Sequence, residues 1–100
     1  MIAETSSRQA VERLRDIQPE LTRYGVGRVW LFGSRARGEA QDGSDWDILV
    51  EFTQPPTFDS YMNLKEHLEQ RLGAPVDLVS RGACRPHFLA AIGGELLDVA

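Results

Sequence analysis

Two aspartates separated by one residue begin the apolar segment DWDILVEF, where acidic side chains need an explanation. They are Asp45 and Asp47. Side chains alternate across a β-strand, so a strand over residues 45–52 places both carboxylates on one face. The apolar residues of the opposite face are then Trp46, Ile48 and Val50. Adjacent carboxylates repel each other, and the pKa of one rises unless a cation lies between them. Mg²⁺ is the expected cation, because it binds carboxylate oxygens together with substrate phosphates.

A third aspartate, Asp77, lies within the short apolar segment VDLV. An acid in a central strand is costly unless it is paired or bound to a metal. If a strand over residues 75–80 lies beside the strand over residues 45–52, Asp77 joins the other two aspartates on one face. Three acids on adjacent strands are the usual scaffold for two divalent ions about 3.5–4 Å apart. Each acid also has an interpretation without a metal. Asp45 and Asp47 could lie at a solvated strand end, and Asp77 could occupy an edge strand or pair with an arginine.

A glycine–serine pair, Gly33-Ser34, follows the apolar segment RVWLF at the point where a helical turn should begin. Exposed backbone N–H groups at the start of a helix bind phosphate, and glycine lets the backbone come close. The serine hydroxyl can also donate to a phosphate oxygen. Arg35 and Arg37 follow, and either could reach a triphosphate, with one of them facing solvent. The segment is not a Walker loop, because it lacks the Gly-Lys-Ser/Thr ending. Considered alone, the pair could equally be an ordinary turn.

The elements expected around these residues are short helices and strands. A first helix, capped by Ser6 or Ser7, ends or kinks at Pro19, and PELTRYG adds a short second piece. Strands are expected at residues 28–32, 45–52 and 75–80, and further helices at residues 58–72 and from residue 87. The closing segment ELLDVA is given no element. The order α-β-β-α-β-α indicates an α+β fold, a small β-sheet with helices packed on it.

Composition bounds the class of protein. The chain has 100 residues, 42% of them hydrophobic and 26% charged, which predicts a single soluble domain over residues 1–100. A formal charge of −4 argues against direct nucleic-acid binding, and no apolar run is long enough to span a membrane. The N-terminal segment lacks the apolar core of a signal peptide, and Cys84 is the only cysteine. We therefore expect a cytoplasmic protein without an internal disulfide.

The spacing of these motifs resembles that of a known family. Gly33-Ser34, ten further residues and then Asp45-Trp46-Asp47 form the Gly-Ser-x10-Asp-x-Asp pattern of the DNA polymerase β-like nucleotidyltransferase superfamily. The fuller string LFGSRARGEAQDGSDWDILVEF resembles the minimal nucleotidyltransferases, the MNT domains of prokaryotes. The resemblance covers nearly the whole chain and is weakest after Ser80. It implies a polymerase β-like core with a mixed sheet, and transfer of a nucleoside monophosphate, often AMP from ATP, with release of pyrophosphate.

The resemblance also implies roles for seven residues. Asp45 and Asp47 would bind the metals, expected to be two Mg²⁺ ions, and Asp77 would complete the metal site and help activate the acceptor hydroxyl. The nucleotide contacts would be Gly33 and Ser34 at the β- and γ-phosphates, with Arg35 and Arg37 as secondary phosphate contacts.

The same resemblance implies a partner. Such domains resemble antitoxins encoded beside a helical HEPN ribonuclease toxin, and some are thought to silence the toxin by attaching AMP to it. The preferred interpretation is therefore a Mg²⁺-dependent protein adenylyltransferase, because a pure binding module has no need of three acids. The alternative is a non-catalytic antitoxin that neutralises its partner by complex formation alone. A nucleotidyltransferase that modifies small molecules such as antibiotics would need a second substrate-binding domain, for which this chain has no room.

Overall fold

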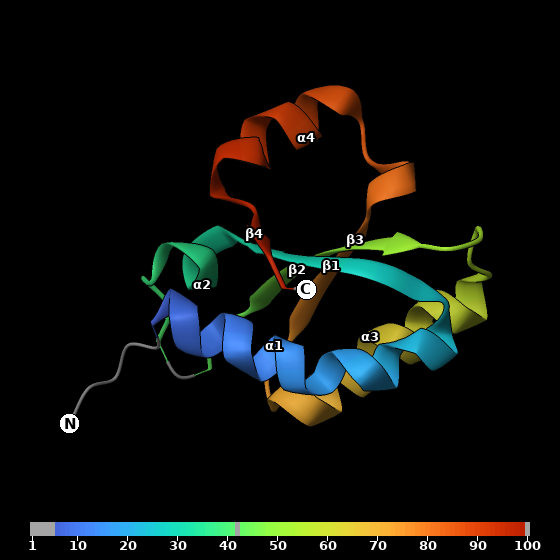
Figure 1. Ribbon diagram of the computed structural model, residues 1–100, viewed down its shortest axis with the longest axis horizontal. Coiled ribbons are helices and arrows are strands. Elements are labelled where there is room, and N and C mark those ends of the chain that lie inside the picture. Colours follow the sequence, from blue (N-terminus) through green and yellow to red (C-terminus); the bar gives the residue numbers. More distant parts are fainter. Residues whose placement is uncertain (1–5, 42, 100) are drawn as a thin grey trace.

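The computed structural model describes residues 6–41 and 43–99 and contains a four-stranded mixed β-sheet with helices on both faces (Figure 1). Helices α1 and α3 lie on one side of the sheet and α4 lies on the other. The helices are α1 (Ser7–Leu21), α2 (Gly33–Arg37), α3 (Phe58–Leu72) and α4 (Pro86–Ile92). The strands are β1 (Val26–Phe32), β2 (Trp46–Phe52), β3 (Val76–Ser80) and β4 (Leu97–Asp98). Short 3-10 turns occupy Thr22–Tyr24, Arg81–Ala83 and Gly93–Glu95. The α+β prediction is confirmed.

The strands follow the order β3-β2-β1-β4 across the sheet. β1 pairs antiparallel with β2 and with β4, whereas β2 pairs in parallel with β3. The register places Asp47 opposite Phe32 on one side and opposite Asp77 on the other. The predicted neighbourhood of the second and third strands is therefore correct.

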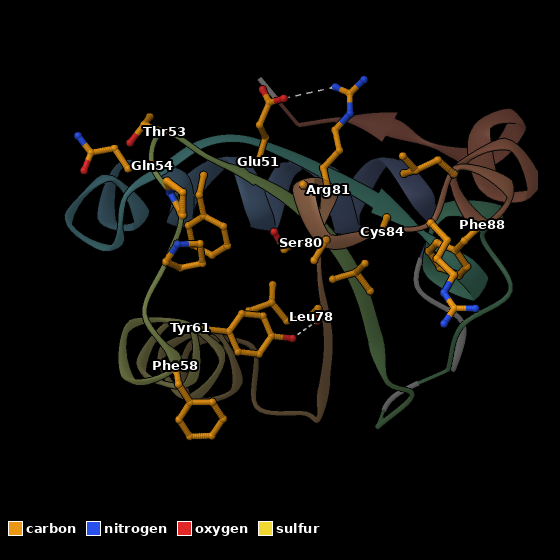
Figure 2. Close-up of a pocket in the computed structure, with 18 of the residues that line it drawn as sticks. Glu51, Thr53, Gln54, Phe58, Tyr61, Leu78, Ser80, Arg81, Cys84 and Phe88 are labelled. Atoms are coloured by element: carbon orange, nitrogen blue, oxygen red, sulfur yellow. Dashed lines mark hydrogen bonds and ion pairs between the residues drawn. The ribbon is translucent and has the colours of Figure 1, made fainter.

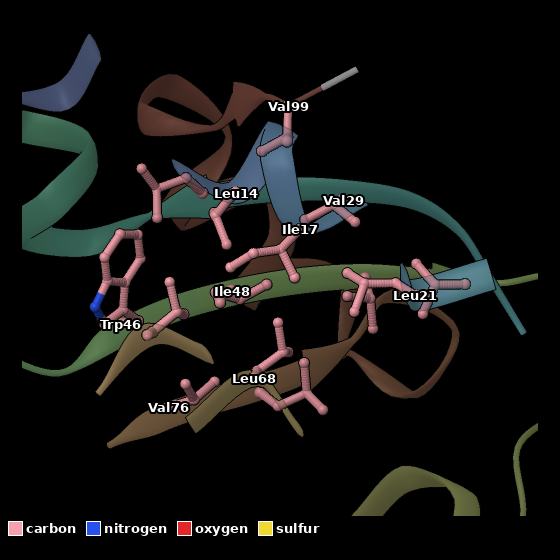
Figure 3. Packing of buried hydrophobic residues seen from close by; sticks show 14 of the residues in the cluster. Leu14, Ile17, Leu21, Val29, Trp46, Ile48, Leu68, Val76 and Val99 are labelled. Atoms are coloured by element: carbon pink, nitrogen blue, oxygen red, sulfur yellow. The ribbon is translucent and has the colours of Figure 1, made fainter. Parts of the chain in front are cut away.

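The main core fills the space between the sheet and the α1 and α3 helices (Figure 3). β2 contributes its alternate residues to this core, and each is 1% exposed or less. They are Trp46, Ile48 and Val50. This confirms the prediction that these side chains point away from Asp47. A smaller cluster on the other face packs under α4 and consists of Trp30, Phe32, Leu49 and Ile92.

Helix α1 begins as predicted but does not end at Pro19. The Ser6 hydroxyl accepts a hydrogen bond from the Gln9 backbone N–H at 3.1 Å, and the Gln9 side chain accepts one from the Ser6 N–H. The helix then continues to Leu21 before the 3-10 turn begins. Ile17 and Leu21 are both buried on either side of the proline. Their packing stabilises the helix through a position where the proline removes one backbone donor.

The closing segment forms a strand that the sequence pattern did not reveal. Leu97 pairs with Leu31, and the Val99 N–H donates to the Val29 carbonyl at 3.1 Å. Two residues are too few to show the alternation from which a strand is predicted. β4 thereby fixes the end of the chain beside β1, the strand that leads into Gly33. None of the helices in the described residues has the length and apolar character needed to cross a membrane.

The core assignment predicts a contrast between two residues of α3. Leu68 is fully buried, so Leu68→Ala should lower the free energy of unfolding by about 2–5 kcal/mol. Met62 lies on the exposed side of the same helix, and Met62→Ala should change it by no more than about 0.5 kcal/mol. Chemical denaturation measures both values. Similar losses for the two variants would contradict the described packing of α3.

Candidate active site

Two of the predicted aspartates lie side by side on neighbouring strands. Asp47 of β2 and Asp77 of β3 are direct partners in the parallel register, on the sheet face opposite α1 and α3. Asp45 immediately precedes β2. Burial raises the pKa of the Asp47 carboxyl above its usual value, and the negative charges of Asp77 and Asp45 raise it further. The negative charges of Asp77 and Asp45 therefore both act on the Asp47 carboxyl.

Asp77 is more exposed than its apolar neighbours suggested. Val76 and Leu78 are buried, but they point to the opposite face, and β3 is an edge strand rather than a central one. Asp77 itself is exposed. The expectation of an acid in a central strand is therefore wrong, and the cost of burying a charge does not explain this residue. The feature that sets Asp77 apart is its position directly beside Asp47 on the neighbouring strand.

The carboxylate oxygens of the three aspartates suit a hard cation, but the aspartates do not form a complete metal-binding site by themselves. Carboxylate oxygens are the ligands that Mg²⁺ prefers. Among the residues that the structure describes, however, no three His, Cys, Asp or Glu side chains converge on one point closely enough to hold an ion. Mg²⁺ is commonly held by one or two carboxylates together with substrate phosphates and water, so these would have to supply the remaining ligands.

Gly33 joins the glycine–serine motif to the aspartates. It follows β1 directly, in register with the end of β2 that carries Asp47, and its φ is +74°. A β-carbon at this position would lie 2.8 Å from Cγ of Asp47, and closer still to its Oδ2. Both the left-handed backbone and the contact with the carboxyl group require glycine here. Ser34 follows as the second residue of α2 and is half-buried.

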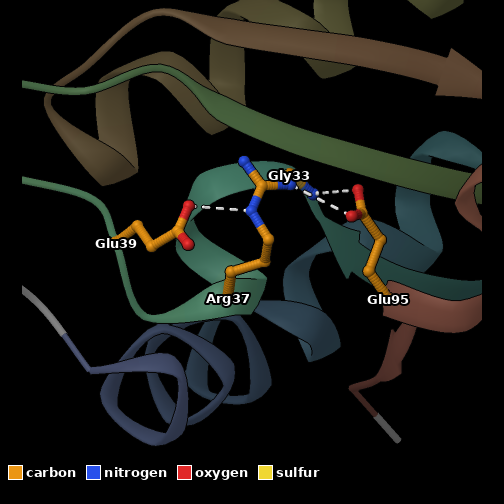
Figure 4. A network of polar contacts seen from close by, with 4 residues as sticks. All are labelled: Gly33, Arg37, Glu39 and Glu95. Carbon is orange, nitrogen blue, oxygen red and sulfur yellow. Dashed lines mark hydrogen bonds and ion pairs between the residues drawn. The ribbon is translucent and has the colours of Figure 1, made fainter.

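Arg37 and the Gly33 backbone both contact a residue that the sequence did not suggest, Glu95 (Figure 4). The Gly33 N–H donates to Glu95 Oε1 at 3.0 Å, and Arg37 Nη1 donates to Glu95 Oε2 at 3.0 Å. Arg37 Nε also donates to Glu39 Oε1 at 2.8 Å. These carboxylates hold the pKa of Arg37 above its ordinary value. No local signal marks Glu95, because it is 62 residues from Gly33 along the chain.

Arg35 is not part of this group. Its side chain is buried, donates from Nη2 to the Ser44 carbonyl at 2.7 Å and stacks 4.2 Å from the Trp46 ring. Trp46 belongs to the main core, on the face opposite Asp47. Residues two apart on a helix point in different directions, which explains why the structure brings Arg37 to the site but not Arg35. In this structure Arg35 holds the loop that leads into Asp45.

A groove of about 1330 Å³ is lined in part by the residues of β3 that follow Asp77 (Figure 2). It lies between the start of α3 and the segment that connects β3 to α4, and its lining includes Tyr61, Leu78, Arg81 and Phe88. The Tyr61 hydroxyl donates to the Leu78 carbonyl. Burial raises the pKa of Tyr61, and the charge of Asp77 raises it further, which places this end of the groove near Asp77. None of the seven predicted site residues lines the groove.

The raised pKa of Asp47 predicts how stability depends on pH. A carboxyl whose pKa is higher in the folded chain than in the unfolded chain makes its ionisation a cost to folding. That cost is absent below the unfolded pKa, about 4, and is fully present above the folded one. In the presence of EDTA, Asp47→Asn should therefore unfold at a higher temperature than the wild type at neutral pH, and the difference should vanish as the pH approaches 3.

Thermal unfolding followed by circular dichroism measures this difference. Asp16→Asn, at an exposed position of α1, is the matched control and should show no comparable gain. An Asp47→Asn variant that is less stable than the wild type at neutral pH would contradict the described electrostatics.

Comparisons with known proteins identify the family of this chain. The family described as polymerase beta, nucleotidyltransferase matches residues 15–96. The protein adenylyltransferase MntA of Thermococcus cleftensis is 44% identical over 77 residues, which are 77% of this chain and 78% of that protein. A solved minimal nucleotidyltransferase superposes with a TM-score of 0.77 at 34% identity, covering 93% of this chain and 95% of the other.

A more distant structure shares the fold. It is the MNT antitoxin in complex with a tri-AMPylated HEPN toxin of Shewanella oneidensis, which matches with a TM-score of 0.61 at 20% identity and covers 94% of this chain and 68% of the other. The family match spans most of the chain and includes all seven predicted site residues. The chain therefore belongs to the polymerase β family of nucleotidyltransferases.

Proposed function

We propose that this nucleotidyltransferase moves AMP from ATP, with Mg²⁺, onto a hydroxyl of a HEPN-type partner protein. The observation that carries the proposal is the placement of Asp47 between Asp77 and the Gly33 backbone. The name of the Thermococcus relative, a protein adenylyltransferase, supports AMP as the transferred group. The Shewanella complex with an AMPylated HEPN toxin supports the class of partner.

The proposed reaction uses the aspartates in two ways. Asp45 and Asp47 would hold the metals, whose positive charge would stabilise the negative charge that develops on the triphosphate. The acceptor oxygen attacks the α-phosphorus, the bond from that phosphorus to the β-phosphate oxygen breaks, and pyrophosphate leaves. Asp77 accepts the proton of the hydroxyl. Its exposure at the edge of the sheet, next to the groove, suits a group that must meet a second substrate.

The remaining site residues position the nucleotide. The Gly33 N–H, the Ser34 hydroxyl and the Arg37 guanidinium donate to the β- and γ-phosphates. We assign no phosphate contact to Arg35, because its side chain is buried against Trp46 and donates to the Gln41 and Ser44 carbonyls. Its proposed work is to hold the chain before Asp45 in place.

A macromolecular acceptor fits the open site better than a small one. Sites for small ligands bury most of the ligand surface. Here Asp77 is exposed and the adjoining groove is open along the surface. A folded partner can bring its own specificity through docking and hold its hydroxyl in line with the nucleotide, which supplies the proximity that this domain lacks.

The alternative, a non-catalytic antitoxin, also has one observation in its favour. The Glu95 carboxylate already occupies the Gly33 N–H and Arg37, two groups that the enzyme needs for the nucleotide. A chain that never releases Glu95 would keep the fold and act by binding alone. The enzyme is the better-supported function, because a binder gains nothing from holding like-charged aspartates together.

Intact mass measurement separates the two functions. The protein encoded beside this chain, incubated with this chain, ATP and Mg²⁺, should gain the mass of one or more AMP groups. The Asp45→Asn/Asp47→Asn double variant should leave the partner's mass unchanged. Neutralisation of the partner without a change in mass, and equally by the double variant, would overturn the enzyme in favour of the binding module.

Asp77 allows a second test of the mechanism. Asp77→Asn should lower the rate of AMP transfer by about 100-fold or more, the range expected for loss of a general base. Its affinity for Mg²⁺-ATP should change far less, because the proposed role concerns the acceptor. Single-turnover transfer and equilibrium nucleotide binding give the two values, with Asp16→Asn as control. Equal losses in both would make Asp77 a nucleotide ligand instead.

A further inference from the structure

Two groups assigned to the triphosphate already hold an anion from the chain itself. The carboxylate of Glu95 accepts from the Gly33 N–H through Oε1 and from Arg37 through Oε2, each at 3.0 Å. Glu95 lies in the 3-10 turn between α4 and β4, and its side chain is 29% exposed. Figure 4 shows it on the side of Arg37 opposite Glu39.

The carboxylate uses these donors as a phosphate would. Its two oxygens receive one backbone and one guanidinium hydrogen bond, the pattern that also binds phosphoryl oxygens. Arg37 has five N–H groups and can serve two anions, as it does for Glu39 and Glu95. The Gly33 amide has a single N–H, so a phosphate oxygen can bond to it only after Glu95 has left.

We propose that Glu95 is an internal competitor for the triphosphate site, so that nucleotide binding requires its carboxylate to leave the Gly33 N–H. This inference rests on the proposed function and adds the regulation of its site. The charge of Glu95 also contributes to the raised pKa of Asp47, which places the competitor close to the proposed metal ligands. Its departure therefore removes one negative charge from the position that the triphosphate must enter.

The path for that departure is short. The side chain is partly exposed, so rotation about its own bonds brings the carboxylate into solvent. β4, which follows at Leu97, can stay paired with β1 during this movement. A partner that offers a cation to Glu95 would favour the released state and so couple docking to nucleotide binding.

Glu39 provides a matched control for charge. It forms an equally close ion pair with Arg37, at 2.8 Å, and its side chain is 63% exposed. In the described structure its carboxylate bonds to Arg37 and not to the Gly33 N–H. Removal of Glu39 therefore takes away the same charge and one Arg37 ion pair while leaving the competitor in place.

The experiment measures binding of Mg²⁺-AMP-PNP and of Mg²⁺-tripolyphosphate by calorimetry, with the full chain. Glu95→Ala should lower both dissociation constants by about tenfold or more, because hydrogen bonds to a charged group no longer have to be broken first. Glu95→Gln, which keeps the shape of the side chain, should give a smaller change in the same direction. Glu39→Ala should change them by less than about threefold, the scale of an exposed ion pair. Binding of AMP, which lacks the β- and γ-phosphates, should be insensitive to Glu95→Ala.

A second measurement follows the Gly33 amide in the wild type. Its ¹⁵N–¹H resonance should move on addition of Mg²⁺-tripolyphosphate, to a position different from that in ligand-free Glu95→Ala.

In the binding experiment, equal effects of Glu95→Ala and Glu39→Ala on the dissociation constants would overturn the inference in favour of a general effect of charge. Weaker binding by Glu95→Ala would show that Glu95 supports the nucleotide. If the wild type and all variants bind the nucleotide with equal affinity, the competitor role of Glu95 is rejected and the proposed function stands. If neither the wild type nor any variant binds the nucleotide, the proposed function itself is rejected.

Discussion

Asp47 and Asp77 repel each other, and the parallel pairing of β2 with β3 holds them together. The free energy that offsets this repulsion comes from the opposite face of the same strands, where Trp46, Ile48 and Leu78 are buried against the helices. Because strand side chains alternate, every anchoring residue is one position away from an acid. A shift of the β2 register by one residue would turn Asp47 into the main core. The register that buries the core residues therefore also fixes the position of the Asp47 charge.

The site draws on three distant parts of the chain. Gly33 ends the first strand, Asp47 lies in the second, and Glu95 comes from the segment before β4. Asp47 approaches Gly33 so closely that a side chain at position 33 would displace the Asp47 carboxylate, while Glu95 binds the same residue through its N–H. The two arginines of the short helix α2 point in different directions. Arg37 points toward the charged site, whereas Arg35 packs on the core tryptophan and fixes the loop before Asp45.

Local sequence pattern was sufficient where the determining interaction was itself local. The alternation in DWDILVEF predicted which side chains of β2 face the core, and the cap at Ser6 predicted the start of α1. Features that depend on tertiary packing could not be predicted from the local sequence pattern. The strand order, which local pattern does not contain, makes Asp77 an edge residue, and packing on both sides carries α1 past Pro19. Glu95 could not be predicted, because only the pairing of β4 with β1 brings it to Gly33.

The two tryptophans lie on opposite faces of the sheet. Trp46 belongs to the main core with α1 and α3, under the Arg35 guanidinium, whereas Trp30 belongs to the smaller cluster beneath α4. Each layer of the molecule therefore has its own intrinsic fluorophore. A chain that keeps only Trp30 reports optically on the layer of α4, and one that keeps only Trp46 reports on the layer of α1 and α3. Loosening of the smaller layer, from which Glu95 reaches the site, can thus be distinguished from unfolding of the whole chain by the emission of a single residue.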